Sequence, residues 1–404
     1  MATYAHNAGV VVLMLFAALN GLERGAGAEV RVASDAELRD ALAQARAGTT
    51  ILIAPGRYHG GLSRSGLHGT AEMPVVLAGA NPEDPPLLLG ERAAGRGTVA
   101  LHLSEARHVV LRDVVVRGFP GNGLNIDDGG RQSTPAAHIT LERVVIEDTG
   151  PVGNHDALKM SGVEKFVIRD CQFRGWGGSG IDFVGCHDGL VEGCRFEGAE
   201  GYSQSNGVQI KGGSRRIRVL ENMFVEAGER AVNLGGSTGE AYFRPAVGDS
   251  EAAEIEVAGN RFIGGMSAVA WVTADGGHVH HNTFVDQRKW VLRILQENQD
   301  PRMRACHGGL FEDNLVVVDG RVQVWLNAGP GTAPETFRFR RNAWCSENAR
   351  QPQLPAPNDD AIFVVGQPLA DPRSDRSAPI AENSPLWEHG AHAYQPRTQP
   401  AGGL

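Results

Sequence analysis

The chain contains many short segments in which apolar and polar residues alternate. Alternation with a period of two is typical of a β-strand that buries one face. A loose pattern of small, apolar, polar and apolar residues recurs in GLNID at 123, ALKMS at 157, GIDFV at 180, GVQIK at 207, AVNLG at 231, AVAWV at 268, VLRIL at 291 and QVWLN at 323. The spacing predicts a repeat of about 23 residues with occasional insertions.

A second series of short strands places one residue of each copy in a common column. This column contains Val114, Val144, Cys171, Cys194, Asn222, Asn260, Asn282, Asn314 and Asn342. Inward asparagines at a turn can bond the turn backbone and the amides of neighbouring coils, so we predict a structural ladder with core thiols beside it. Units this short have no room for a crossover helix and bury their apolar side by stacking in parallel. We therefore predict an all-β fold, a parallel β-helix.

The two ends of the chain differ from the repeats. Residues 34–48 show capping-box spacing between Ser34 and Glu37 and end at Gly48, so we expect a helix that closes the first coil. An apolar run followed by small residues predicts a signal peptide over residues 1–28, and hence a secreted or periplasmic protein with no membrane association after cleavage. Residues 29–404 should form a single β-helix domain with an irregular C-terminal cap from about residue 346.

Charge and cysteine content exclude several classes of protein. The formal net charge is -9 and no Lys/Arg cluster follows one face, which argues against a nucleic-acid partner. None of the five cysteines has CxxC spacing, so a zinc site is not expected, and an odd number leaves at least one thiol free in an exported protein.

The repeat also predicts which residues share the outer face of one sheet. A row of small residues contains Gly123, Ala157, Gly180, Gly207, Ala231 and Ala268. A polar row beside it contains Asn125, Lys159, Asp182, Gln209, Asn233, Ala270, Arg293 and Trp325, and a third row contains Asp127, Ser161, Val184, Lys211, Gly235, Val272, Leu295 and Asn327. We expect a groove with a bare floor and a polar wall that accepts an elongated ligand.

Insertions fall beside this face and would form its walls. Three of them follow the first strand of a unit, at 128–138, 236–251 and 296–309, and a fourth at 198–205 precedes it. Tyr242 is the loop aromatic that we predict to contact substrate. Other aromatic residues available for stacking on sugars are Trp176, Tyr202, Phe243 and Trp290.

The N-terminal helix, APGRY, the stacked units, the asparagines and the closing SPLWEHGAHAY resemble the right-handed parallel β-helix proteins of the pectate-lyase-like superfamily. MPVVLAGANPEDPPLL and QIKGG are most similar to polysaccharide lyase family 6, the alginate lyases and chondroitinase B-like enzymes. The resemblance implies that Lys211 is the catalytic base. It also implies an arginine one coil later, where Gly235 stands, so that Arg230 or Arg293 would have to substitute.

The same resemblance implies a calcium ion, but Gln204 and Asn206 stand where acidic ligands would be expected. We therefore predict no bound metal or other cofactor, with calcium as the alternative. The partner that the resemblance implies is a polysaccharide, most simply an anionic one.

The chemistry of β-elimination leads to the same face. Cleavage of a uronate needs a group that neutralises the carboxylate, a base for the C5 proton and a proton for the leaving oxygen. Gln209 and Asn233 are candidates for the carboxylate, and Lys211 is the candidate base if Arg215, Arg216 or Lys159 crowd it with positive charge. Lys159 is a second candidate base, with a simple ion pair to Asp182 as the alternative.

Further polar residues lie at the edge of this face. His155 is a candidate acid or base, and Asp156, Asp182, Asn125 and Arg293 are candidate substrate contacts.

Two other classes of function stay open. NHDAL resembles the NTDG element of polygalacturonases, which would make Asp156 part of a glycoside hydrolase, but Gly178 and Ser179 stand where paired aspartates are expected. A uronate epimerase and a noncatalytic glycan-binding protein fit the same scaffold. A lyase that cleaves a uronate-containing glycan is the function we predict.

Overall fold

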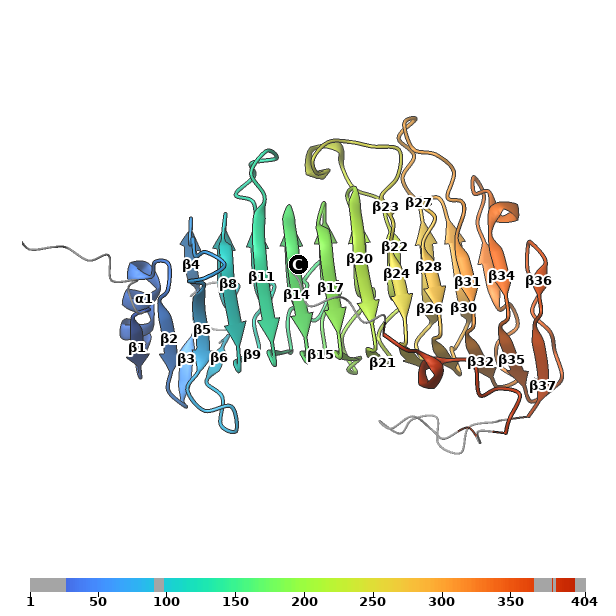
Figure 1. Cartoon of the computed structure of the whole chain (residues 1–404), viewed down its shortest axis with the longest axis horizontal. Coiled ribbons are helices and arrows are strands. Elements are labelled where there is room, and N and C mark those ends of the chain that lie inside the picture. Colours follow the sequence, from blue (N-terminus) through green and yellow to red (C-terminus); the bar gives the residue numbers. More distant parts are fainter. Residues whose placement is uncertain (1–26, 91–97, 367–379, 381–382, 397–404) are drawn as a thin grey trace, which may run out of the picture.

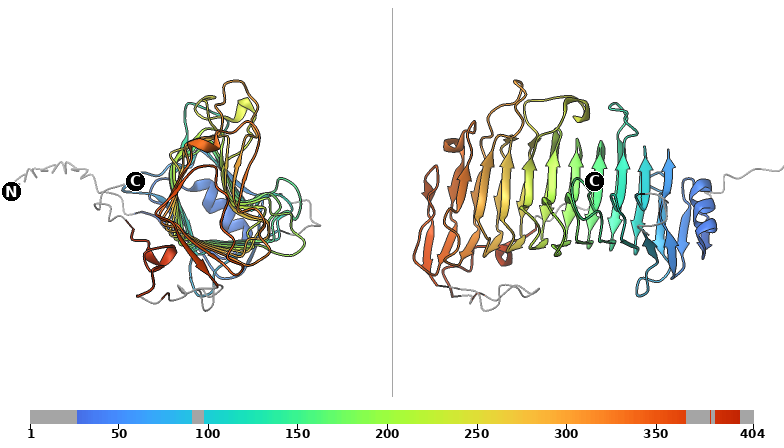
Figure 2. Two further views of the ribbon diagram at one scale, coloured as in Figure 1. Left: turned by 90° about the vertical axis from the view of Figure 1, so that its right-hand side faces the viewer. Right: turned by 180° about the vertical axis from the view of Figure 1, so that it is seen from behind.

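The computed structural model describes residues 27–90, 98–366, 380 and 383–396. It is a right-handed parallel β-helix, as predicted, in which each coil adds one strand to each of three long parallel sheets (Figure 1). Viewed along the axis, the sheets enclose a three-sided interior and loops project from two of the corners (Figure 2). Nearly all of the predicted signal peptide lies outside the described residues.

Sheet A forms one side of the coil. Within the described residues it contains β1 (Glu29–Val32), β2 (Thr50–Ile53), β5 (Val75–Gly79), β8 (Arg107–Arg112), β11 (Ala136–Glu142), β14 (Val163–Arg169), β17 (His187–Glu192), β20 (Ser214–Leu220), β23 (Ala252–Ala253), β24 (Glu256–Ala258), β27 (Ala274–Asp275), β28 (His278–His280), β31 (Leu310–Glu312), β34 (Arg338–Arg340) and β36 (Asn358–Asp359).

Sheet B follows sheet A in each coil. Its strands are β3 (Arg57–His59), β6 (Leu87–Leu89), β9 (Val115–Arg117), β12 (Val145–Glu147), β15 (Gln172–Arg174), β18 (Arg195–Glu197), β21 (Met223–Val225), β25 (Arg261–Ile263), β29 (Thr283–Val285), β32 (Leu315–Val318), β35 (Ala343–Ser346) and β37 (Ile362–Val365). Strand pairing thus continues past residue 346, where the sequence periodicity fades.

Sheet C completes the coil and carries the polar row. Its strands are β4 (Leu62–Ser65), β7 (Leu101–Ser104), β10 (Leu124–Asp127), β13 (Leu158–Ser161), β16 (Ser179–Val184), β19 (Asn206–Lys211), β22 (Arg230–Gly235), β26 (Ser267–Val272), β30 (Trp290–Leu295) and β33 (Leu326–Ala328). Val208 and Ile210 of β19 are fully buried, whereas Gln209 and Lys211 face outward and are partly exposed. The predicted alternation on this strand is confirmed.

The asparagine ladder is present in the core at the corner between sheets A and B. The backbone N–H of Asn260 donates to Oδ1 of Asn282 at 2.9 Å, and that of Asn282 donates to Asn314 at 2.9 Å. The Nδ2 atom of Asn282 also donates to the carbonyls of Val257 and His280, both at 2.8 Å. The asparagine side chains therefore provide hydrogen-bond partners for backbone N–H and carbonyl groups of the turn that would otherwise be buried without them.

The small-residue row does not line an outer groove, which corrects the prediction. A Cβ atom added to Gly207 would lie 3.1 Å from the ring of Phe224, and one added to Gly180 would lie 2.9 Å from Phe196. Both rings belong to a stack on the inner face of sheet B, with neighbouring centroids 4.7 to 5.0 Å apart. These positions are therefore small because they pack against the stack.

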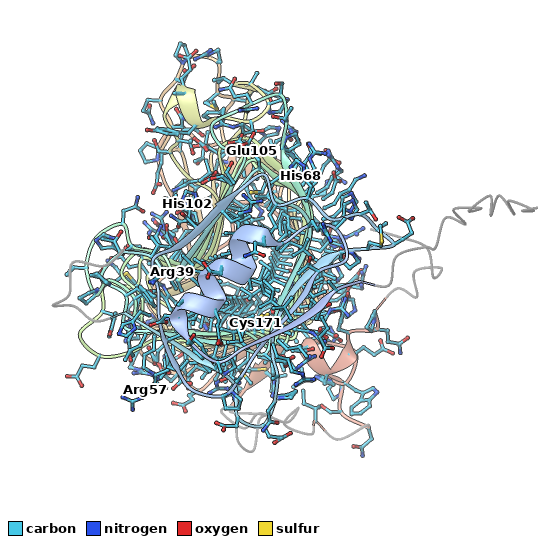
Figure 3. All side chains as sticks on the ribbon, turned by 90° about the vertical axis from the view of Figure 1, so that its left-hand side faces the viewer. Arg39, Arg57, His68, His102, Glu105 and Cys171 are labelled. Carbon is cyan, nitrogen blue, oxygen red and sulfur yellow. The ribbon has the colours of Figure 1, made fainter. Side chains whose placement is uncertain are left out.

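Helix α1 (Asp35–Gln44) covers the N-terminal end of the coil, and Figure 3 shows it lying across that opening. The backbone N–H of Glu37 donates to Oγ of Ser34 at 3.3 Å, and Glu37 accepts from the N–H of Ala33 at 2.7 Å. The predicted cap is confirmed, although the helix ends at Gln44, before Gly48. None of the helices in the described part of the chain is long and apolar enough to cross a membrane.

Three single-turn 3-10 helices occur in the described ranges: Glu240–Tyr242, Pro334–Thr336 and Ala391–Ala393. The last of these packs along the body, because the N–H of Ala391 donates to Thr283 of β29 at 2.9 Å. The described tail thus lies against sheets A and B, where Tyr394 also packs beside His280 and His281.

Candidate active site

The polar row runs across neighbouring strands of sheet C in the predicted register. Asn125 pairs with Lys159, Lys159 with Asp182 and Asp182 with Gln209. The row continues through Asn233, Ala270 and Arg293 to Asn327. Trp325 was wrongly assigned to it, because this residue is buried just before β33. Parallel strands lie about 4.8 Å apart, so the row is a line of side chains at that spacing.

Lys159 lies at the centre of a compact cluster of charges. Its Nζ is 2.5 Å from Oδ2 of Asp182 and 3.2 Å from Oδ2 of Asp156. Both carboxylates have 0% exposed side chains, whereas 28% of the Lys159 side chain is exposed. A buried carboxylate is stable only when it is paired, and one lysine serves both groups here.

The charges in this cluster shift its protonation equilibria. Burial and the adjacent charge of Asp182 raise the pKa of Asp156 to about 6, even though Lys159 lowers it in part. Burial alone would lower the pKa of Lys159, but the charges of Asp182 and Asp156 outweigh it and hold that pKa above its usual range. Lys159 is therefore a permanent ammonium group at neutral pH, which disfavours it as a base.

Lys211 reaches the same cluster from the next coil. Its Nζ lies 3.3 Å from Oδ1 of Asp182 and donates to Oε1 of Gln209 at 3.1 Å. Gly236 covers it, since a Cβ atom added there would be 3.3 Å from Cδ of Lys211. The side chain is 17% exposed.

Two of the three cations expected to crowd Lys211 pair with other carboxylates. Arg216 instead pairs with Asp188 at 2.6 Å and Arg215 lies 4.0 Å from Asp249, both on sheet A. Lys159, the third cation named in the prediction, does lie beside Lys211, because both ammonium groups contact the carboxylate of Asp182.

Asp156 also fixes the loop that precedes β13. Its Oδ1 accepts the N–H of Ser179 at 2.8 Å, and its own N–H donates to Asn122 at 2.8 Å. Asn122 in turn donates to Oδ1 of Asn125 at 2.8 Å. His155 packs at this turn with its side chain close to Gly150. Asp156 is thus held from both sides.

Arg230 and Arg293 form a second polar cluster farther along sheet C. Arg230 pairs with Glu297 at 2.5 Å and approaches Oδ1 of Asn233 at 3.5 Å. The guanidinium of Arg293 lies over the ring of Trp290 at 4.1 Å, and burial together with the charge of Arg230 lowers the pKa of Arg293. Asn233 is fully buried, so its amide supports Arg230 and does not reach the surface.

Loops at the corner between sheets C and A are tied together by buried charges. Arg244 of the 236–251 loop pairs with Asp128 at 2.6 Å, and both side chains are largely buried. Glu251 is also buried, and it accepts the N–H of Gly212 at 2.7 Å and Nδ2 of Asn298 at 2.6 Å. These contacts hold three insertions as one wall beside the polar row, and Figure 2 shows loops projecting from the upper corner of the coil.

The predicted sugar-stacking aromatics are mostly unavailable. Trp176 is fully buried and donates Nε1–H to the carbonyl of Asn206 at 2.7 Å, and Phe243 is buried as well. The ring of Trp290 is covered by Arg293 and Lys289. Tyr242 stands out at the tip of its loop with 65% exposure.

The positions that the resemblance assigns to calcium ligands do not fit a metal. Oε1 of Gln204 accepts the N–H of Ala199 at 2.9 Å, and its Nε2 donates to the carbonyl of Tyr202 at 3.0 Å. Asn206 donates to Oγ of Ser179 at 3.5 Å. Gln204 thus closes its own loop and Asn206 bonds to the neighbouring strand β16, whereas calcium requires six to eight oxygen ligands. Across the described residues no group of three or more His, Cys, Asp or Glu side chains is placed to hold a metal ion.

Sequence reasoning missed a histidine at the N-terminal end of the polar row. His102 pairs in register with Asn125, and its Nε2 lies 2.6 Å from Oδ2 of Asp127 and 3.1 Å from Oγ of Ser104. The hydrogen bond to Asp127 raises the pKa of His102 despite partial burial. The segment ALHLS at 100 has the small, apolar, polar, apolar pattern of the repeats, and this signal would have identified it.

All five cysteines are buried free thiols, with Cys171 and Cys194 in the core as predicted. Burial raises the pKa of Cys186 to about 12 and that of Cys306 to about 11, so these thiols are not activated nucleophiles.

Comparisons with known proteins agree with this architecture. Residues 99–284 match the family described as "Right handed beta helix region". A PL6 family polysaccharide lyase from Pseudopedobacter saltans aligns with a TM-score of 0.51 at 14% identity, over 91% of this chain and 99% of that one. A comparison with curated proteins finds no match.

Two further structures align over most of the chain. An alginate lyase from Paenibacillus sp. gives a TM-score of 0.49 at 17% identity, over 84% of this chain and 98% of that one. The A-module of a mannuronan C-5 epimerase from Azotobacter vinelandii gives 0.49 at 15% identity, over 82% and 94%. Likeness at such low identity concerns the fold alone. The predicted resemblance is confirmed at that level: the chain has the right-handed parallel β-helix fold that the lyase from Pseudopedobacter saltans also has.

Proposed function

We propose that this protein is a polysaccharide lyase that cleaves a uronate-containing glycan by β-elimination on the outer face of sheet C. The observation that carries the proposal is the pair of lysines on the polar face. Lys159 and Lys211 both expose part of their side chains, and the carboxylates behind them are buried. The face therefore offers two lysine Nζ groups to an anionic glycan and keeps its own carboxylates away from it. The same P. saltans lyase, similar in fold, supports a glycan as the substrate.

Lys159 is the group that neutralises the uronate carboxylate in this proposal. It stays charged because Asp156 and Asp182 raise its pKa, and two buried carboxylates fix its position. A fixed positive charge beside the substrate carboxylate stabilises the carbanion that forms when C5 loses its proton. This chain would thus use an ammonium group where the resemblance implies calcium.

Lys211 is the proposed base. In its amine form it takes the C5 proton, the C4=C5 double bond forms, and O4 leaves with the electron pair of the broken C4–O4 bond. The protonated Lys211 then returns its proton to O4, which restores the amine. Gln209 holds Nζ of Lys211 through the 3.1 Å hydrogen bond and thereby orients it toward the polar row.

Arg230 is placed to stabilise negative charge on the leaving oxygen. Gln209 and Asn233 are register neighbours on β19 and β22. Lys211 contacts Gln209 from the C-terminal end of β19, and Arg230 contacts Asn233 at 3.5 Å from the N-terminal end of β22. Neighbouring parallel strands are about 4.8 Å apart, close to the spacing that one sugar residue would bridge. In this proposal Asn233 positions Arg230 and does not contact the substrate.

Hydrolysis by Asp156 and Asp182 is not favoured. A glycosidase needs two carboxyl groups that reach the glycosidic bond from either side. Both carboxyls are fully buried, and their oxygens are engaged by Lys159, Lys211 and the N–H of Ser179.

The test is an assay for the unsaturated product on alginate, pectate and glycosaminoglycans, with Lys211→Met and the control Lys165→Met. Lys165 is an exposed lysine on sheet A. Elimination on one of these glycans should fall by about 10²–10⁴-fold in Lys211→Met and stay unchanged in the control. It should also survive chelation of divalent ions.

Three results would speak against the proposal. New reducing ends without unsaturated product would indicate hydrolysis. Altered uronate configuration without cleavage would indicate an epimerase, and binding without turnover would indicate a noncatalytic glycan-binding protein. We also propose that the protein acts outside the cytoplasm, for which N-terminal sequencing of the mature chain after Ala28 is the check.

A further inference from the structure

A cavity of about 300 Å³ lies on the outer face of sheet A, behind the loop that covers Lys211. We call it the sheet A pocket. Its floor contains Glu164, His187 and Arg215, which are register neighbours on β14, β17 and β20. Its roof is the part of the 236–251 loop from Arg244 to Gly248. Figure 1 shows this loop above the upper ends of β17 and β20.

His187 is the most unusual residue of the pocket. It is 7% exposed, and within the described residues neither ring nitrogen makes a hydrogen bond of normal geometry. Burial lowers its pKa, although the nearby carbonyl of Arg244 acts in the opposite direction. The neutral ring has one donor and one acceptor nitrogen. A buried polar group without a protein partner is costly, and His187 lines the cavity, so both nitrogens are free for a ligand there.

Arg215 is held loosely in comparison with the other arginines around the pocket. Its Nη2 lies 4.0 Å from Oδ1 of Asp249 and 3.5 Å from Oγ of Ser250. Arg216, by contrast, makes two hydrogen bonds to Asp188 at 2.6 and 3.2 Å. The guanidinium of Arg215 therefore retains capacity to bind an anion.

Glu164 provides the opposite chemistry at the other end of the floor. Its carboxylate is partly exposed and acts electrostatically on His187 and Arg216, and it is an acceptor that suits hydroxyl groups. Three strands at about 4.8 Å spacing place Glu164 and Arg215 roughly 10 Å apart, with His187 between them. The floor thus offers an acceptor, a mixed donor and acceptor, and a cation in one line.

We propose that the sheet A pocket binds one small hydroxylated monocarboxylate, of the size and class of a single uronic acid. Arg215 binds the carboxylate, and His187 and Glu164 bind hydroxyl groups. The volume is at the lower end of the range for small-molecule sites, which suits a single sugar ring. A more highly charged anion such as phosphate is disfavoured, because the Glu164 carboxylate lies in the same cavity. The proposal does not depend on the reaction proposed for sheet C.

Isothermal titration calorimetry on the full chain tests the proposal with D-glucuronate, D-galacturonate, D-mannuronate and L-guluronate as probes. D-glucose and inorganic phosphate are the comparison ligands. At least one uronate should bind, and Arg215→Met should weaken it by tenfold or more, that is by about 1.4 kcal/mol. Glu164→Gln should weaken it less, because an amide oxygen still accepts from a hydroxyl group.

The matched control is Arg112→Met. Arg112 lies on β8 of the same sheet with a comparable 4.0 Å ion pair to Asp113, but outside the pocket. Its substitution should leave uronate binding unchanged, and Lys211→Met should also bind normally, which separates this site from the one on sheet C. Circular dichroism verifies that each variant is folded.

The proposal is overturned if none of the uronates binds at millimolar concentration. It is also overturned if glucose or phosphate binds as tightly as the best uronate, or if Arg215→Met and Arg112→Met behave alike.

Discussion

Replacement of Lys159 by Met removes the cation that two buried carboxylates share. Asp156 and Asp182 have 0% exposed side chains, and Lys159 contacts them at 3.2 and 2.5 Å. Removing one partner of a buried ion pair costs about 3–5 kcal/mol, because the remaining charge is left uncompensated. Lys211 still contacts Asp182 at 3.3 Å, so we expect Asp156 to account for most of the loss.

The free energy of unfolding lost in Lys159→Met should be larger at neutral pH than at acidic pH. In the folded protein the pKa of Asp156 is raised from 3.8 to about 6, so the folded state binds more protons than the unfolded state between these values. The contribution of Asp156 to the free energy of unfolding therefore falls as pH rises from 3.8 to about 6. Loss of Lys159 raises that pKa further, so the destabilisation should be smaller at about pH 5 than at about pH 7.5.

Urea unfolding followed by tryptophan fluorescence measures this effect, because Trp176, Trp271 and Trp344 are buried. Lys165→Met is the control, since its side chain is exposed on sheet A and should change the free energy of unfolding little. A loss below about 1 kcal/mol at neutral pH, the value of a surface ion pair, would refute the idea of a buried network. Equal losses at both pH values would refute the assigned protonation of Asp156.

Three further outcomes follow from the contacts in the coil. Asn282→Ala should cost about 3 kcal/mol or more in urea unfolding, because the carbonyls of Val257 and His280 lose their donor; near-wild-type stability would contradict a structural ladder. His102→Asn should destabilise the protein at acidic pH and have little effect at alkaline pH. The pKa of His102 is raised in the folded protein, so its contribution to stability is complete below the unfolded-state pKa of 6.5 and is lost as pH rises through the folded-state pKa. A loss of stability that does not depend on pH would exclude the pair with Asp127. Arg244→Met leaves the buried Asp128 unpaired and should cost about 3 kcal/mol, with faster proteolysis in the 236–251 loop; unchanged proteolysis would show that this ion pair does not hold the wall.

Local and repeated features of this protein were predictable from its sequence. The alternation of Val208 and Ile210 with Gln209 and Lys211, the cap at Ser34 and the asparagine ladder all depend on short-range periodicity or on one residue type at a fixed place in each coil. Because every coil stacks on the previous one, a repeat also predicts which residues become neighbours. For this reason the register of the polar row was predicted correctly from Asn125 to Arg293.

Other features depended on how the sheets and loops pack. Gly207 was assigned to an outer row, but it packs against Phe224 of the neighbouring sheet B. The burial of Asp156, Asp182 and Asn233 depends on neighbouring coils and covering loops that no single repeat contains. The partner of Lys211 proved to be a carboxylate, because the side chain turns back along its strand.

The sequence by itself therefore determined the coil, its direction of stacking and the line of polar side chains. Tertiary structure alone decided which charges are buried, which are shared and where the sheet A pocket closes, since Glu164 and Gly248 meet across a large separation in sequence. The physical reason is that strand alternation and register follow from the covalent geometry of each repeat. Burial and electrostatic pairing instead depend on atoms from several coils and loops at once.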